Sequence, residues 1–195
     1  MFREQRLEIF EYVSVLTSII IGLGLAYLLA GIARLIQHPG RFPVYWVHLV
    51  WVAYVFFFMS FWWWWQFKLD TLAVWYFQNY LFLLIYAVVL YMICALLSPS
   101  DLSEYRSYEE YFFSRRRWFF GLLAATYVLD VYDTWLKGAE HFHSLGPQYP
   151  LQIGVYISLA IAAILTANRK FHGLLAVVAL GYNIYWAFLF WGTQG

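Results

Sequence analysis

Six apolar segments constrain the fold of this chain more than any other feature. About 20 helical residues cross the hydrocarbon core of a bilayer, which is about 30 Å thick. Segments of about this length lie at residues 11–35, 44–67, 73–97, 118–137, 149–167 and 171–192. Hydrophobic residues make up 64% of the 195 and charged residues 12%, against about 45–50% and about 25% in soluble domains. We therefore expect an all-α, polytopic membrane protein, with six transmembrane helices in a compact bundle that forms a single domain over residues 1–195.

The connection between the third and fourth segments resembles a helix of its own. Asp101 and Glu104 have the spacing of a helix cap. Apolar and aromatic residues follow at helical spacing, namely Leu102, Tyr105, Tyr108, Phe112 and Phe113. We expect an interfacial amphipathic helix near residues 101–115, with Arg115 to Arg117 on anionic lipid. The alternative is a docking surface for a partner protein.

The distribution of basic residues predicts the orientation. The three connections after odd-numbered segments, with their adjoining helix ends, hold eight Lys and Arg, and the rest of the chain holds four. The positive-inside rule then places both termini outside, in a bacterial inner membrane or another cytoplasmic-type membrane. The 12 basic and 11 acidic residues are nearly balanced, which argues against nucleic acid as a partner and leaves the lipid bilayer as the expected one.

Four consecutive tryptophans, Trp62 to Trp65, are interpreted as a membrane anchor. Consecutive helical residues point about 100° apart, so the four surround the helix axis and do not form a stripe. Tyr45 and Trp46 lie at the other end of the same segment, about 24 Å away at 1.5 Å per residue. Two aromatic girdles at this separation match the two bilayer interfaces, with Lys68 extending into the headgroups. An aromatic cage for a ligand or pigment is the alternative.

Polar residues inside the apolar segments are the main candidates for a functional site, because burying them in lipid is costly without partners. Asp130 has no evident partner on its own helix, whereas Asp133 can pair with Lys137 four residues later. Similar depths along their helices allow a polar pocket, opening outward and able to bind a ligand or ion, built from Asp130, Asp133, Asn183, Asn79 and Glu11. The alternative is that these groups only hydrogen-bond helices together.

The first segment carries a stripe of small residues, which predicts a seam of close helix packing. Polar and small residues recur at intervals of three and then four positions, namely Glu11, Ser14, Ser18, Gly22, Ala26, Ala30 and Arg34. Stripes of this kind permit two helix backbones to approach closely.

The histidines suggest two narrower sites. His141 and His143, with Glu140 and Asp133, could ligate a divalent metal on the outer side. His48 and His172 lie near the cytoplasmic ends of two segments and could hold a haem between helices. Solvated interfacial histidines are the simpler interpretation of the second pair.

Two classes of function remain open. Nucleotide-binding, hydrolase and zinc-protease motifs are absent from the sequence, so an enzyme is not indicated and no cofactor is identified. The first class is a small transporter or channel, working as an oligomer, that binds a cation, proton or polar solute at Asp130. The second is a non-catalytic membrane subunit or sensor that binds lipid, pigment or a partner protein.

Overall fold

The computed structural model describes residues 2–72 and 74–191, and within these ranges the side chains of residues 2–7, 71, 141 and 189–191 are not described. The described chain is helical and contains no strand. The elements are α1 (Phe2–Gln37), α2 (Trp46–Trp65), the 3-10 helix η1 (Gln66–Thr71), α3 (Phe77–Leu97), α4 (Tyr108–Leu136), α5 (Ala139–Ser144), α6 (Gln148–Leu165) and α7 (Arg169–Trp191).

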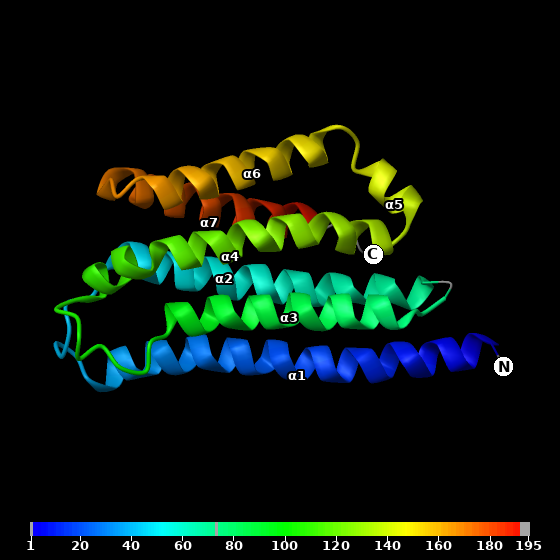
Figure 1. Cartoon of the computed structure of the whole chain (residues 1–195), viewed down its shortest axis with the longest axis horizontal. Coiled ribbons are helices and arrows are strands. Elements are labelled where there is room, and N and C mark those ends of the chain that lie inside the picture. The colour runs from blue at the N-terminus through cyan, green and yellow to red at the C-terminus, as the bar shows by residue number, and fades with distance from the viewer. Residues whose placement is uncertain (1, 73, 192–195) are drawn as a thin grey trace.

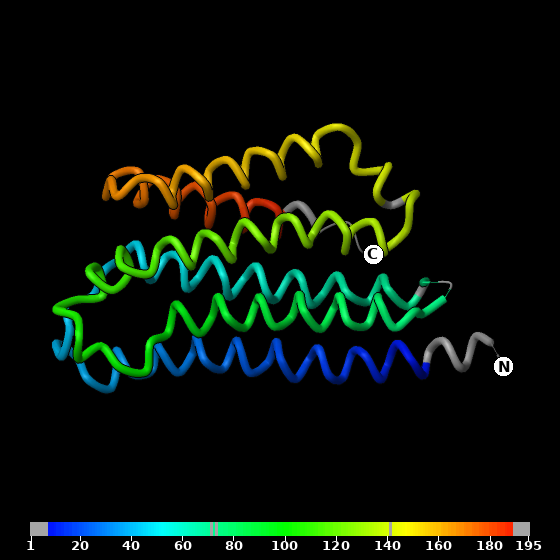
Figure 2. The backbone as a smooth tube through the Cα atoms, viewed as in Figure 1, coloured from blue at the N-terminus to red at the C-terminus, as the bar shows by residue number. Residues whose placement is uncertain are grey.

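The six long helices lie side by side and alternate in direction along the chain (Figure 1). The backbone trace shows η1 and α5 in the connections at the end where α1 begins (Figure 2). Helix α1 packs mainly on α3, α3 also on α4, and α4 also on α6, while α7 packs mainly on α2. Helix α4 therefore packs between α3 and α6, and its packed faces can carry polar groups that would be costly against lipid.

Five of the six expected spans are long and apolar enough to cross a membrane: Glu8–Gln37, Trp46–Asp70, Phe77–Leu97, Gln148–Leu165 and Arg169–Phe188. These spans support a multi-pass membrane protein. The segment predicted at 118–137 belongs to α4, which is not among the five, because Asp130 and Asp133 lower its hydropathy. The sixth span is not confirmed.

The separate interfacial helix near residues 101–115 is not found. Residues 101–107 are turns and bends, and residues 108–115 are the first turns of α4. Asp101 accepts hydrogen bonds from the Ser103 backbone N–H and hydroxyl, both at 2.8 Å, and so forms a local turn instead of capping a helix. The cap lies at Ser107, whose hydroxyl accepts from the Glu110 N–H at 3.2 Å.

The aromatic side of this segment faces the protein and not the headgroups. Leu102, Tyr108, Tyr111 and Phe112 are all buried in the hydrophobic core. The Tyr111 hydroxyl donates to the Leu96 carbonyl at 2.8 Å, near the end of α3. The predicted lipid-facing surface is therefore wrong, because helical spacing identifies an apolar face without identifying what covers it.

The close-packing seam of α1 also lies on another face than predicted. Gly22, Ala26 and Ala30 are exposed, and a methyl group added at Gly22 would meet nothing within 4 Å. The seam against α3 contains Gly24 and Gly31 instead, where an added methyl would come within 3.3 Å of Cys94 Sγ and 2.5 Å of Ser98 Oγ respectively. The buried positions of α1 repeat every three or four residues, as in a coiled coil, and not every four.

Candidate functional site

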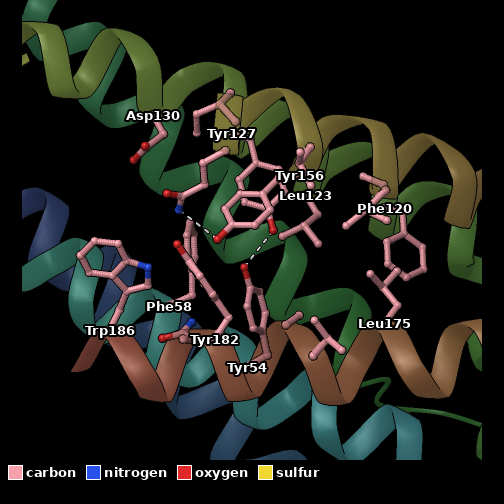
Figure 3. A pocket seen from close by; sticks show the side chains of 18 of the residues that line it. Tyr54, Phe58, Phe120, Leu123, Tyr127, Asp130, Tyr156, Leu175, Tyr182 and Trp186 are labelled. Atoms are coloured by element: carbon pink, nitrogen blue, oxygen red, sulfur yellow. Dashed lines mark hydrogen bonds between the residues drawn. The ribbon is translucent and has the colours of Figure 1, made fainter. Parts of the chain in front are cut away.

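A cavity of about 610 Å³ lies among α2, α4, α6 and α7 (Figure 3). Helix α6 packs mainly on α4 and helix α7 mainly on α2, whereas α6 and α7 contact each other sparsely. The space between them is bounded by side chains of all four helices. Val155 on α6 and Val178 on α7 line this space and are 48% and 55% exposed. The opening therefore lies between α6 and α7, toward the surroundings of the bundle.

Aromatic side chains make up ten of the 23 described residues that line the cavity. The hydroxyls of Tyr54 on α2 and Tyr127 on α4 are hydrogen-bonded to each other at 2.8 Å, so this buried polar pair is satisfied. The Tyr127 ring lies 5.0 Å from that of Tyr156 on α6, which lies 6.0 Å from that of Tyr182 on α7. This series of rings crosses the cavity from α4 to α7 (Figure 3).

One end of the cavity is polar. The Tyr149 hydroxyl, at the start of α6, lies 2.8 Å from Asp130 Oδ2 and 3.0 Å from Thr134 Oγ1. Gln152, one turn further along α6, donates to the Tyr156 hydroxyl at 2.9 Å. Asp130 and Trp186 lie toward this end in Figure 3, and Phe120 and Leu175 lie toward the other. The cavity is thus amphipathic along its length.

Asp130 supplies the charge of this cavity. Among the described residues that line it, Asp130 is the one acid, and there is no Lys, Arg or His. Within the described part of the chain, no basic side chain lies within 4.0 Å of its carboxylate. The expectation that Asp130 lacks an ionic partner agrees with this geometry, although Tyr149 provides a hydrogen bond that the sequence did not predict.

Only some residues of the predicted polar pocket line the cavity. Asn183 lines the cavity with Asp130, as the common depth suggested. Asn79 is buried in the first turn of α3, and Glu11 is exposed on α1; neither lines the cavity.

Asp133 belongs to a different polar group. Its fully buried carboxylate is 2.6 Å from Lys137 Nζ, as its spacing predicted, and 3.3 Å from Gln66 Nε2. The hydrogen bond from Gln66 ties α4 to η1, and neither Asp133 nor Lys137 lines the cavity.

The residues that sequence reasoning missed are the tyrosines and the glutamine of the cavity wall. Tyr149, Gln152 and Tyr156 are spaced by three and four residues and so share one face of α6. This spacing predicts a polar stripe on an otherwise apolar helix.

The two histidine hypotheses receive no support from the geometry. His48 and His172 are buried, and each ring has its Nε2 at hydrogen-bond distance from a carbonyl oxygen, 2.7 Å for Leu97 and 3.0 Å for Thr166. The Phe112 ring packs against both imidazoles, at centroid distances of 6.3 and 5.7 Å, where a haem would have to lie. Haem ligation therefore remains a prediction.

The outer metal site also remains a prediction. His143 is exposed on α5, and the side chain of His141 lies outside the described residues. Elsewhere in the described chain, no group of three or more His, Cys, Asp or Glu side chains is placed to hold a metal ion.

The four tryptophans surround their helix, as the geometry of consecutive residues requires. Trp63 and Trp64 are about half exposed, whereas Trp62 is buried against the Tyr86 ring at 4.9 Å. Lys68 Nζ lies 4.5 Å from the centre of the Trp65 ring, in a cation–π contact. Two of the four are therefore available to an interface, and Trp62 belongs to the core.

Comparison of the whole chain with protein-family models, curated proteins and solved structures finds no match. The candidate function therefore depends on the cavity alone.

Proposed function

We propose that this multi-pass membrane protein binds a small, largely apolar organic molecule in the cavity among α2, α4, α6 and α7. The observation that carries the proposal is the cavity itself. Its volume of about 610 Å³ falls within the range of roughly 300–1,000 Å³ that is typical of small-molecule sites. A wall of aromatic side chains with a few polar groups at one end is also typical of such sites.

The position of the opening supports access from the membrane. Between α6 and α7 the exposed lining residues are apolar, including Val155 and Val178. In a bilayer these faces contact acyl chains, so an apolar molecule dissolved in lipid can enter without crossing water. This is the class of membrane sensor or subunit that binds lipid, pigment or another apolar ligand.

Photo-crosslinking with an alkylbenzene that carries a diazirine tests this proposal. The protein is reconstituted in nanodiscs, and the labelled residues are mapped by mass spectrometry. We expect labelling to concentrate on the cavity wall, and we expect Ala179→Phe, which fills the cavity, to reduce it strongly. The same substitution at exposed Ala26 on α1 is the matched control and leaves the labelling unchanged. Labelling spread evenly over all lipid-facing residues, and insensitive to Ala179→Phe, would refute the proposal.

Transport is the second candidate function. The observation that favours it is Asp130, a carboxylate inside the bundle without a basic partner among the described residues, since intramembrane acids commonly lie on ion or substrate paths. Asp130→Asn in proteoliposomes should then abolish flux of protons or of small cations. Flux that persists unchanged in this variant argues against transport through the site.

The orientation and the oligomeric state are part of the same proposal. With both termini outside, Pro39 in the first connection faces the cytoplasm, and Pro39→Cys in a Cys94→Ala background should react with an impermeant thiol reagent only from that side.

A homo-oligomer would place the exposed Gly22, Ala26 and Ala30 of α1 against another copy. Cross-linking in native membranes that yields a monomer alone would contradict the homo-oligomer.

A further inference from the structure

We infer that the ligand of the α2–α4–α6–α7 cavity is a small organic cation with an aromatic or alkyl body, whose positive nitrogen lies against Asp130. This inference rests on the proposed function, because it specifies the chemistry of the molecule that the cavity accepts.

The charge of the cavity selects a cation. Asp130 is the one ionisable acid among the described lining residues, and no basic side chain accompanies it there. An isolated carboxylate removed from water is costly unless a positive partner compensates it. A ligand that brings the missing positive charge is therefore favoured over a neutral one. A phosphate or carboxylate would meet Asp130 without a compensating base, which excludes anionic lipids and anionic pigments.

The aromatic wall also favours a cation. Tyr156, Tyr182 and Trp186 line the same cavity as Asp130, from α6 and α7, and Trp186 lies toward the end that holds Asp130 (Figure 3). The face of an aromatic ring attracts a cation within about 6 Å, and desolvated sites strengthen this attraction. Aromatic rings and a carboxylate in one cavity thus suit a quaternary or protonated amine, whose weakly hydrated charge tolerates an apolar site better than an inorganic ion does.

The neutral polar groups do not replace the role of Asp130. Gln152 donates to Tyr156, and the hydroxyls of Tyr54 and Tyr127 satisfy each other. The Tyr149 hydroxyl is occupied by Asp130 and Thr134, and it holds the carboxylate at the end of the cavity. These contacts are internal to the protein, and the remaining amide side chains of the lining, those of Gln148 and Asn183, are neutral, so Asp130 is the lining group that attracts a cation most strongly.

The length of the cavity orients the ligand. The end formed by Phe120 and Leu175 is apolar, whereas Asp130 and Trp186 lie toward the opposite end (Figure 3). A molecule with a hydrocarbon body and one charged nitrogen matches this division, with its body toward Phe120. A divalent or strongly hydrated cation would leave the apolar end unfilled.

Competition by an isosteric pair of probes tests the inference. Benzyltrimethylammonium and neopentylbenzene have nearly the same shape, but only the first is charged. Each is titrated against the diazirine crosslinker in nanodiscs that contain wild type, Asp130→Asn or Asp130→Glu. Comparing variants for each probe cancels the different partitioning of the two probes into lipid.

The expected result is specific to the charge. Asp130→Asn should raise the half-inhibiting concentration of benzyltrimethylammonium at least about tenfold, which corresponds to about 1.4 kcal/mol, and should leave that of neopentylbenzene within about twofold. Asp130→Glu, which keeps the charge, should restore most of the response.

Failure of the inference differs from failure of the proposed function. If both probes compete for the cavity and Asp130→Asn changes neither, the cavity binds apolar molecules and the cation inference is overturned. If the crosslinker does not label the cavity at all in wild type, the proposed function itself fails. Should Asp130→Asn not fold, wild type decides: a cationic probe that competes no better than the neutral one, after correction with lipid-only nanodiscs, overturns the inference.

Discussion

The packing of α1 against α3 decides whether replacing a glycine of α1 by alanine raises or lowers the stability of the protein. A methyl group at Gly31 would lie 2.5 Å from Ser98 Oγ and 3.0 Å from Ser98 Cβ. The Ser98 backbone is itself held, because its carbonyl accepts a hydrogen bond from Arg34 at 3.2 Å. Rotation of the Ser98 hydroxyl would still leave its Cβ 3.0 Å from the added methyl group, so Gly31→Ala must push the two segments apart.

The size of this effect follows from a comparison within the same helix. Replacing Gly by Ala stabilises a helix by about 0.8–1.0 kcal/mol through intrinsic propensity. At Gly22 nothing lies within 4 Å, so Gly22→Ala gains this amount. At Gly31 the same gain is opposed by overpacking, which costs about 1–3 kcal/mol. The difference between the two variants is therefore about 1–3 kcal/mol, with Gly31→Ala the less stable.

Thermal unfolding of both variants in one detergent measures this difference. A change of 1 kcal/mol shifts Tm by roughly 2–4 °C for chains of 150–250 residues, so Gly31→Ala should melt several degrees below Gly22→Ala. Adding Ser98→Gly removes the clashing side chain and should recover most of the loss. Equal melting temperatures for the two single variants would refute the close approach of α1 to α3 at Gly31.

Two further variants test the elements that position α4. Ser107→Ala removes the cap that accepts from the Glu110 N–H and should lower the free energy of unfolding by about 1 kcal/mol, measured by thermal melting. Asp101→Ala should have little effect. A larger loss of stability for Asp101→Ala than for Ser107→Ala would indicate that the helix begins at Asp101. Lys137→Met leaves the buried Asp133 carboxylate without the ammonium group that lies 2.6 Å away and should lower the free energy of unfolding by about 3–5 kcal/mol. The double variant with Asp133→Leu should recover stability. An unchanged free energy of unfolding for Lys137→Met alone would contradict the buried pair.

Several features of the site could be predicted from residue types and spacing. Asp130 and Asn183 were placed at one depth by counting residues along their helices, and the structure puts both on one cavity. The pairing of Asp133 with Lys137 followed from a separation of four residues on a helix. Counting along a helix works for depth because the rise per residue is constant.

Other features could not be predicted, because they depend on how each helix is rotated about its axis. Gly22 and Gly31 look alike in the sequence, but one is exposed and the other meets Ser98. Asn79 shares a depth with Asp130 but lies on α3, which does not border the cavity. Tyr149 reaches Asp130 only because α6 packs along α4.

The sequence by itself determined the environment and the local structure: apolar segments about 20 residues long require lipid, and their backbones must then be helical to satisfy every N–H and C=O. The tertiary structure alone decided which helices are neighbours. Within a membrane the hydrophobic effect does not drive helices together, so packing shape and a few polar contacts choose the partners. Because α6 packs on α4 and α7 packs on α2, a space remains between α6 and α7, and this space is the cavity that Asp130 lines.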